Sequence, residues 1–98
     1  MADLLIWSER ATEEFNKLQD YLISEWGEDI SRRVLAEISQ TLIRIQNSPE
    51  HFPYVKEQKK IRLCVASPQT SIYFQELKDA VVIVSVFDNR QNPRKLKL

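Results

Sequence analysis

Five basic residues of this chain have the side-chain types that chemistry at a phosphate requires: His51, Lys59, Lys60, Arg62 and Arg90. An arginine stays protonated at neutral pH, so it can hold a phosphate or stabilise developing charge but cannot move a proton. A histidine, or a lysine whose pKa is lowered by burial, can act as acid or base, and such a group accelerates a reaction by about 10²- to 10⁴-fold. Cleavage of RNA by its 2′-hydroxyl would therefore depend on His51 or the lysines.

Each of these residues also has a purely structural interpretation. Arg62 is a strand residue that could simply be solvated or paired with an acid, and Arg90 follows Asp88 closely enough to form an ion pair with it. The lysines are typical of a solvated basic rim, and His51 is typical of a surface loop between prolines. The sequence therefore gives candidates for catalysis without an evident cluster of acids and bases.

The last residues of the chain indicate a surface for another polypeptide. Residues 90–98 read RQNPRKLKL, in which leucines alternate with lysines. This pattern suits pairing as a strand or lying in a groove, and the charges discourage self-association while leaving the backbone available. We therefore predict a protein-binding surface made of Arg62, Tyr73, Arg90, Arg94, Lys95, Leu96 and Leu98.

Length and composition favour a single domain over residues 1–98. The chain is 43% hydrophobic and 29% charged, with one glycine and four prolines, which leaves no flexible linker. At this length folding hides roughly 60 to 70% of the surface of the unfolded chain. The net charge is zero, but residues 1–55 sum to −5 and residues 56–98 to +5. Overall neutrality argues against a protein that depends on phosphate contacts.

The compartment and the absence of cofactors follow from what the sequence lacks. No apolar run approaches the roughly 18 residues of a membrane span, and the start, MADLLIWSER, is unlike a secretory signal. Cys64 is the single cysteine and has no Cys/His cluster around it. We expect a cytoplasmic protein with no metal site, no cofactor and no membrane partner.

The first half of the chain predicts two helices. Residues 4–7 read as a short buried strand, Ser8 is a candidate N-cap, and Gly27 offers a left-handed stop. Two helices joined by the short segment GED must form an antiparallel hairpin. The apolar stripes that define them are Ala11, Phe15, Leu18, Leu22 and Trp26 in the first helix, and Ile30, Val34, Ile38, Leu42 and Ile45 in the second.

The second half predicts three strands, KIRLCV, TSIYFQEL and AVVIVSVF, separated by turn-sized gaps. They form an antiparallel meander, whose last strand is apolar throughout, as a central strand is. In the first of them Ile61, Leu63 and Val65 are expected to face the core, which places Arg62 on the sheet face away from the helices.

The predicted fold is α+β, with element order β-α-α-β-β-β. An antiparallel helix hairpin packs on one face of a four-stranded, mainly antiparallel twisted sheet. The strand at residues 4–7 must join this sheet to satisfy its backbone, and the sequence leaves both an edge position and a parallel pairing open.

Four segments taken in order resemble the RelE/ParE superfamily of small bacterial toxins from toxin-antitoxin pairs. They are IWSERATEEF at the start of the hairpin, SPEHFP at its end, IR on the next strand and VSVFDNRQNP on the last. The resemblance covers nearly the whole chain and rests on order, spacing and length, because each motif alone is common. It implies a twisted antiparallel sheet with two packed helices, and neutralisation by a cognate antitoxin that wraps the toxin.

The superfamily has two branches, and the resemblance favours the ParE-like one. RelE-like members are ribosome-dependent mRNA endonucleases that use basic side chains on the sheet and often a tyrosine or histidine near the C-terminus. ParE-like members lack that set and are similar to proteins that poison DNA gyrase. Arg62 and Arg90 match the family's two arginine positions, but after Phe87 the sequence DNRQNPRKLKL contains no histidine or aromatic residue.

We therefore expect a bacterial growth-inhibiting toxin without catalytic chemistry of its own, bound by an antitoxin and directed at a topoisomerase, DNA gyrase. One alternative is a RelE-like mRNA interferase that acts on the ribosome and its mRNA, with Arg62 and Arg90 on phosphate and Lys59, Lys60 or His51 handling protons. A second alternative is a degenerate, non-toxic scaffold retained for binding its partner.

Overall fold

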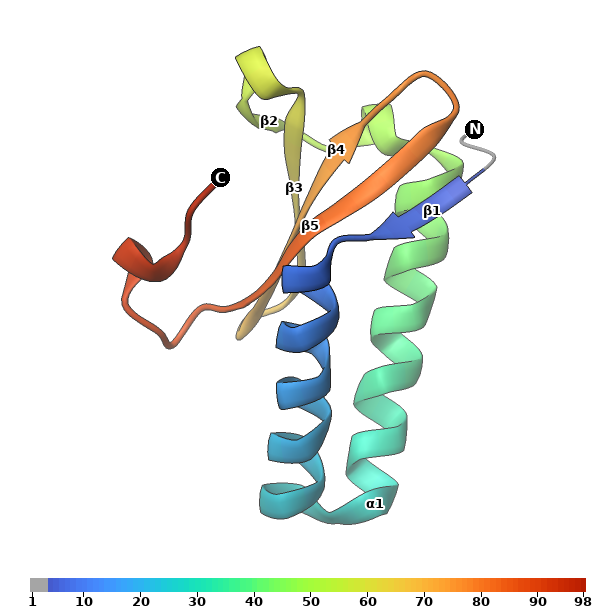
Figure 1. The fold of residues 1–98 in the computed structure, drawn as a ribbon. Coiled ribbons are helices and arrows are strands. Elements are labelled where there is room, and N and C mark those ends of the chain that lie inside the picture. The colour runs from blue at the N-terminus through green and yellow to red at the C-terminus, as the bar shows by residue number, and fades with distance from the viewer. Residues whose placement is uncertain (1–3) are drawn as a thin grey trace.

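The computed structural model describes residues 4–98, which form one long helical element and five strands (Figure 1). The fold is α+β, as predicted, and residues 1–3 of the expected domain lie outside the described part. The elements in chain order are β1 (Leu4–Trp7), α1 (Glu9–Asn47), β2 (Tyr54–Lys56), β3 (Ile61–Ser67), β4 (Thr70–Glu76) and β5 (Ala80–Asp88), with 3-10 turns η1 (Pro49–His51), η2 (Glu57–Lys59) and η3 (Pro93–Lys95).

The strands form one sheet in the order β1-β5-β4-β3-β2. The meander of β3, β4 and β5 is confirmed, and β1 is an edge strand that pairs parallel with β5. The predicted count of four strands is wrong, because β2 adds a fifth strand at the other edge. β2 has only three residues and pairs with β3 in an irregular register. So short a segment shows no alternation of apolar and polar residues from which a strand could be predicted.

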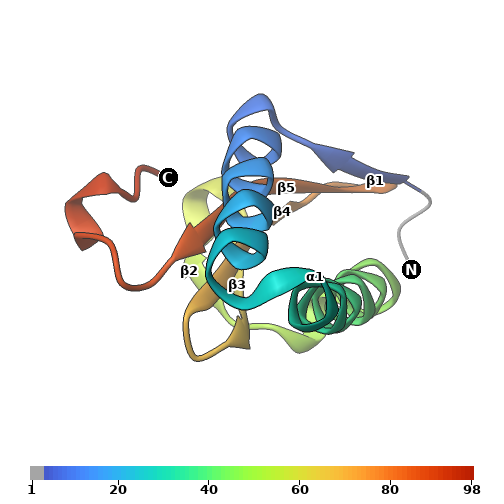
Figure 2. The same cartoon turned by 90° about the horizontal axis from the view of Figure 1, so that it is seen from below.

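The helical element α1 begins at a cap and bends once. The Ser8 side chain accepts a hydrogen bond from the Ala11 N–H, which confirms the predicted N-cap. Gly27 has φ 82° and ψ 174°, a conformation that L side chains rarely adopt. It divides α1 into a first arm (residues 9–26) and a second arm (residues 28–47), which run antiparallel side by side (Figures 1 and 2). The predicted hairpin differs in detail, since one non-helical residue replaces a turn between two separate helices.

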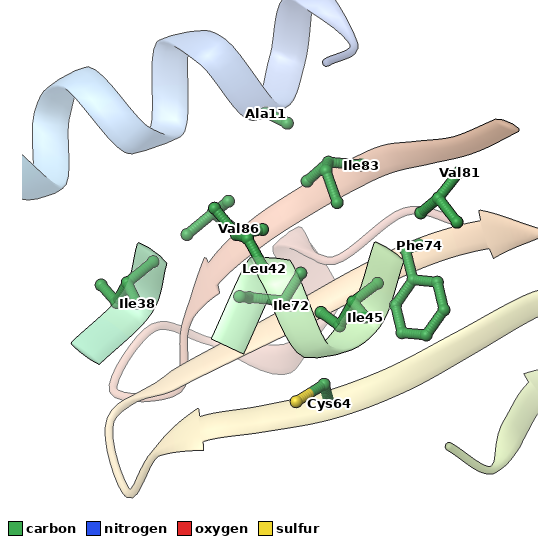
Figure 3. Packing of buried hydrophobic residues seen from close by; sticks show 10 residues of the cluster. All are labelled: Ala11, Ile38, Leu42, Ile45, Cys64, Ile72, Phe74, Val81, Ile83 and Val86. Atoms are coloured by element: carbon green, nitrogen blue, oxygen red, sulfur yellow. The ribbon is translucent and has the colours of Figure 1, made fainter. Parts of the chain in front are cut away.

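The core lies between the sheet and the two arms, as Figure 3 shows. Phe74, Ile72, Ile83 and Val81 of the sheet and Ile45 of the second arm are fully buried. The packing of the second arm on these sheet residues explains why apolar residues recur at helical spacing in the sequence. The cluster consists of Ala11, Ile38, Leu42, Ile45, Cys64, Ile72, Phe74, Val81, Ile83 and Val86.

The prediction for the faces of β3 is wrong. Arg62 lies opposite Phe74, and Cys64 lies opposite Ile72, so both share the face that packs on the helices. Val65 points the other way and is 61% exposed. The side chains of β3 do alternate between the two faces, but Cys64 lies on the core face, because a free cysteine behaves as a small hydrophobe. Arg62 is therefore buried on the helix side of the sheet.

The first arm also completes the edge of β5 where β1 ends. Pairing between β1 and β5 stops at Trp7 opposite Ile83. Beyond it, the Glu14 carboxylate accepts hydrogen bonds from the Val86 N–H at 3.2 Å and from the Ser85 hydroxyl at 2.9 Å. The carboxylate thus takes the place of a missing strand, and the buried hydroxyl of Ser85 is satisfied.

Candidate functional site

The guanidinium of Arg62 is occupied by internal partners. Its Nε and Nη2 each lie 2.9 Å from Oε1 of Glu76, and Nη1 donates to the Phe52 carbonyl oxygen at 2.5 Å. The Tyr54 ring covers the guanidinium, with 3.9 Å between Cζ and the ring centroid. Arg62 as a whole is 9% exposed. A phosphate could reach this side chain only if Glu76 and Tyr54 moved aside.

Arg90 forms a different cluster after the end of β5. Its guanidinium donates to both carboxylate oxygens of Asp88 and, at 2.5 Å, to the hydroxyl of Tyr21, whose ring it also covers. These hydrogen bonds lower the pKa of Asp88 and raise that of Arg90 further above its usual range. The Arg90 side chain is still 43% exposed. It is held in place and remains accessible to a partner.

The two arginines lie at opposite ends of β4. Arg62 is opposite Phe74 and Asp88 is opposite Thr70, so four residues of β4, about 13 Å, separate the two positions along the strand. Two strand spacings separate them across the sheet as well, because one belongs to β3 and the other follows β5. The structure therefore does not bring Arg62 and Arg90 to one site.

The predicted proton carriers are on loops. His51 ends η1, is exposed, and lines a shallow cavity of about 300 Å³ with Arg44. Lys59 and Lys60 are exposed where η2 leads into β3, and Lys60 has the left-handed φ of 57°. None of the hydrogen bonds described for residues 4–98 joins these side chains to Arg62 or Arg90. The structure does not assemble the five residues expected for RNA cleavage.

A groove that the sequence did not indicate runs along α1. Two adjoining cavities of about 310 and 400 Å³ share Arg90 and Tyr21 as lining residues. Trp26 and Ile30, near the bend of α1, are 57% and 40% exposed. We define the hairpin groove as Leu18, Tyr21, Leu22, Trp26, Ile30, Val34, Pro68 and Arg90.

The apolar helix residues of this groove belong to the two stripes that predict the helices. A stripe at helical spacing looks the same whether a sheet or a partner covers it. In the structure Ile38, Leu42 and Ile45 belong to the core cluster, and Leu18 and Val34 pack against it. Trp26 and Ile30, next to the bend, are instead exposed. The position of Trp26 at the end of the stripe, directly before the predicted stop at Gly27, was the sequence signal that could have located the groove.

The predicted binding residues of the C-terminal segment do not pair as a strand. Residues 89–98, here called the tail, leave the end of β5 and fold back so that the C-terminal end lies on the β2 side of the molecule (Figures 1 and 2). Arg94 and Lys95 are exposed, and Leu96 and Leu98 are half-buried. Tyr73, also predicted for the binding surface, is half-buried and lies opposite Leu63. Its side chain is on the face of the sheet that points away from the core.

Three cations hold the tail, and of these the sequence indicates only Lys59 as a candidate functional residue. Arg10 donates to the carbonyl oxygens of Lys95, at 3.2 Å, and of Lys97. The ammonium groups of Lys56 and Lys59 both donate to the main-chain oxygen of Leu98, at 3.1 Å each.

The described residues offer no cluster for a metal and no membrane helix. Within residues 4–98 no group of three or more His, Cys, Asp or Glu side chains is arranged to hold a metal ion. No helix in the same range has the length and apolarity that crossing a bilayer requires. Among the described residues, the hairpin groove has the accessible cation Arg90 on its wall.

Comparison with known proteins agrees with this fold. Residues 5–93 match the family model described as ParE toxin of type II toxin-antitoxin system, parDE. A solved structure of the chromosomal ParDE TA system from P. aeruginosa superposes with a TM-score of 0.75 at 14% identity, covering 90% of this chain and 96% of that one. A copper-bound mutant toxin from Helicobacter pylori gives a TM-score of 0.55 at 20% identity, covering 88% and 93%. No sequence among curated proteins matches.

Proposed function

The chain belongs to the ParE toxins of type II toxin-antitoxin systems, and from this premise we propose that it inhibits growth by binding DNA gyrase and that a cognate antitoxin neutralises it. Binding, not bond cleavage, is the activity that its surfaces support. Gyrase is the target because the ParE-like branch, to which the sequence is similar, poisons that enzyme.

One observation carries the choice of binding over catalysis. The Arg62 guanidinium, which an RNase would need on a phosphate, is paired with Glu76 at 2.9 Å and covered by the Tyr54 ring. Freeing it would leave the Glu76 carboxylate without this partner and would cost the charge-assisted hydrogen bonds, about 1.5 to 3 kcal/mol. Arg90, at the far end of β4, cannot compensate for that loss at the same phosphate.

The hairpin groove is the surface that we assign to the antitoxin. Its apolar residues Trp26 and Ile30 are exposed at the bend of α1, and Arg90 adds an accessible cation at the wall. An amphipathic helix can lay an apolar face into such a groove and place an acidic residue on the cation. The similar structure from P. aeruginosa is a ParDE system, which supports a bound antitoxin here.

A supercoiling assay with purified gyrase tests the target. We expect the full chain to inhibit ATP-dependent supercoiling, and we expect prior mixing with the cognate antitoxin to restore it. Gyrase that stays active at a large molar excess of the toxin would remove this target. Codon-specific cleavage of mRNA on translating ribosomes would instead establish the interferase, and harmless over-expression in a host with sensitive gyrase would establish the scaffold.

Two isoleucines of the second arm provide a matched test of the groove. Ile30 lines the groove and is 40% exposed, whereas Ile43 is 50% exposed and is not a lining residue. Ile30→Glu removes apolar area from the contact, so antitoxin affinity should fall by tenfold or more, from the roughly 1.5 kcal/mol that such a side chain contributes. Equal weakening by Ile43→Glu, in calorimetric titrations, would rule out the groove as the docking surface.

A further inference from the structure

The two adjoining cavities along α1 differ in the charges that line them. Both include Arg90 and Asp88, which form an ion pair with 2.7 Å between Nη2 and Oδ2. The cavity of about 310 Å³ also includes Lys17, and the cavity of about 400 Å³ includes Glu37 instead. One charged residue of each sign therefore lies on either side of a shared ion pair.

Lys17 and Glu37 are the charges of these two linings that lack an internal partner. The remaining acid, Glu14, lies 3.6 Å from the guanidinium of Arg10. Lys17 and Glu37 are both exposed, and neither side chain has an ion pair or hydrogen bond among those described for residues 4–98. The smaller cavity is thus left with a cation to be paired, and the larger one with an anion.

The two residues stand opposite each other on the arms of α1. Each is ten residues from Gly27, so in antiparallel arms both lie about 15 Å from the bend (Figure 1). Lys17 is one turn from Tyr21, and Glu37 is one turn from Val34. Packed helices lie about 8 to 10 Å apart, so a segment that fills both cavities passes from the positive wall to the negative one.

A partner that fills these cavities has to satisfy both charges. An exposed charge is solvated by water, but a charge at the wall of a filled cavity loses part of this water. The loss is offset only where the partner supplies a charge of the opposite sign. The apolar contacts of the groove have no direction of their own, so they fit a bound segment equally well either way round. The charges are what distinguishes the two directions.

We propose that the antitoxin segment in the hairpin groove carries an acidic residue toward Lys17 and a basic residue toward Glu37, on either side of its apolar face, and that this pair fixes the direction in which the segment binds. A reversed segment would bring like charges together at both walls, which weakens binding. The inference rests on the proposed antitoxin site and adds its charge pattern. Lys17 and Glu37 are specificity residues, whereas the apolar residues supply the contact area.

Two single charge reversals test this pattern in calorimetric titrations of the full chain with the cognate antitoxin at low salt. Lys17→Glu and Glu37→Lys change the net charge of the protein in opposite directions. We nevertheless expect each to weaken binding by tenfold or more, since each places like charges together at one wall. An antitoxin segment that is acidic along its whole length would instead bind Glu37→Lys more tightly than the parent, and this result would overturn the proposal.

A double reversal with a matched control separates the groove charges from charge in general. Lys17→Glu with Glu37→Lys leaves the net charge unchanged, as does Asp20→Lys with Arg33→Glu, at exposed positions of the same arms outside both linings. The first pair should weaken antitoxin binding by more than tenfold and the second should not change it. Equal affinities of the two pairs would overturn the proposal. Thermal melts of each variant alone check that it is folded.

A neutral pair gives a second measurement without introduced repulsion. Lys17→Gln with Glu37→Gln should bind more weakly than the parent at low salt, and its affinity should depend less on salt. An unchanged salt dependence would contradict the proposal. If Ile30→Glu weakens binding but the charge variants do not, the antitoxin site stands and its charge pattern is wrong. If Ile30→Glu has no effect either, the site itself is wrong.

Discussion

Two guanidinium nitrogens of Arg62 on β3 each lie 2.9 Å from the same carboxylate oxygen, Oε1, of Glu76 on β4. The Arg62 side chain is 11% exposed to solvent. A pair this well shielded leaves a buried charge behind when one partner is lost. The relationship explains why an arginine that resembles a catalytic one has a structural environment in this chain.

Glu76→Ala should therefore destabilise the protein. Nε and Nη2 of Arg62 lose their acceptor, and we expect the free energy of unfolding to fall by about 1.5 to 3 kcal/mol in urea denaturation. Glu57→Ala, at an exposed position of η2, is the control and should stay within about 0.5 kcal/mol of the parent. Equal effects of the two substitutions would show that the pair adds nothing to stability.

The bend of α1 should depend on Gly27. A side chain there meets no atom within 4 Å, so the cost of Gly27→Ala comes from the backbone conformation alone. With φ at 82° we expect a loss of roughly 1 to 3 kcal/mol of unfolding free energy. Ser24→Ala, an exposed position in the first arm, serves as the control. A Gly27→Ala protein as stable as the parent would mean that the bend tolerates another conformation.

Ser31 is expected to be a destabilising residue. Its Oγ is the one buried side-chain polar atom of residues 4–98 that lacks a hydrogen-bond partner, and the residue is 2% exposed. Ser31→Ala should raise the free energy of unfolding by about 1 kcal/mol. Ser39→Ala, exposed on the same arm, measures the gain from helix propensity alone. If both substitutions stabilise equally, the buried hydroxyl carries no penalty.

Cys64 should be inert in the folded protein. Burial raises the pKa of its thiol, and the charge of Arg44 opposes this only in part. We expect Ellman's reagent to react at the rate of unfolding, with denaturant restoring the rate of a free thiol. Because the unfolded thiol ionises near pH 8.5 and the folded one later, stability should fall as pH rises above about 8.5. Cys64→Ala should remove this slope, and a slope that persists in Cys64→Ala would assign it to another group.

The pKa of Asp88 should depend on its hydrogen bonds with Arg90. Hydrogen bonds from Arg90 lower the pKa of Asp88 below 3.8, so the stability that this carboxylate contributes is present above its unfolded pKa and lost as pH falls through the lowered value. In Arg90→Gln the pKa should return toward 3.8, as followed by ¹³C NMR of the carboxyl group. Arg94→Gln should leave the titration unchanged. An unaltered titration in Arg90→Gln would show that the pair does not persist in solution.

Features fixed by local chemistry were predictable. The Ser8 cap, the break at Gly27 and the order of the meander each depend on neighbouring residues and were confirmed. The face of Arg62 was not predictable in the same way. Both alternations of β3 contain apolar residues, and pairing of Cys64 with Ile72 on β4 decides which one meets the helices.

The same distinction between neighbouring and distant residues applies to the candidate sites. The basic and apolar residues of the tail were recognised, but the cations that hold it come from α1, β2 and η2, far away in the chain. The same holds for the hairpin groove, in which Arg90 meets Tyr21 across 69 positions of sequence. A pattern of spacing along one segment contains no information about which distant segment it will face.

By itself the sequence determined the fold class, the helical stripes and the resemblance to a toxin family, because periodicity, caps and motif order are written in consecutive residues. Only the tertiary structure decided that Arg62 is sequestered by Glu76, that Arg90 stays accessible beside a groove, and that the tail rests on three cations. The physical reason is that an ion pair's role depends on burial and on its partner, and both are set when strands and helices from distant parts of the chain pack together.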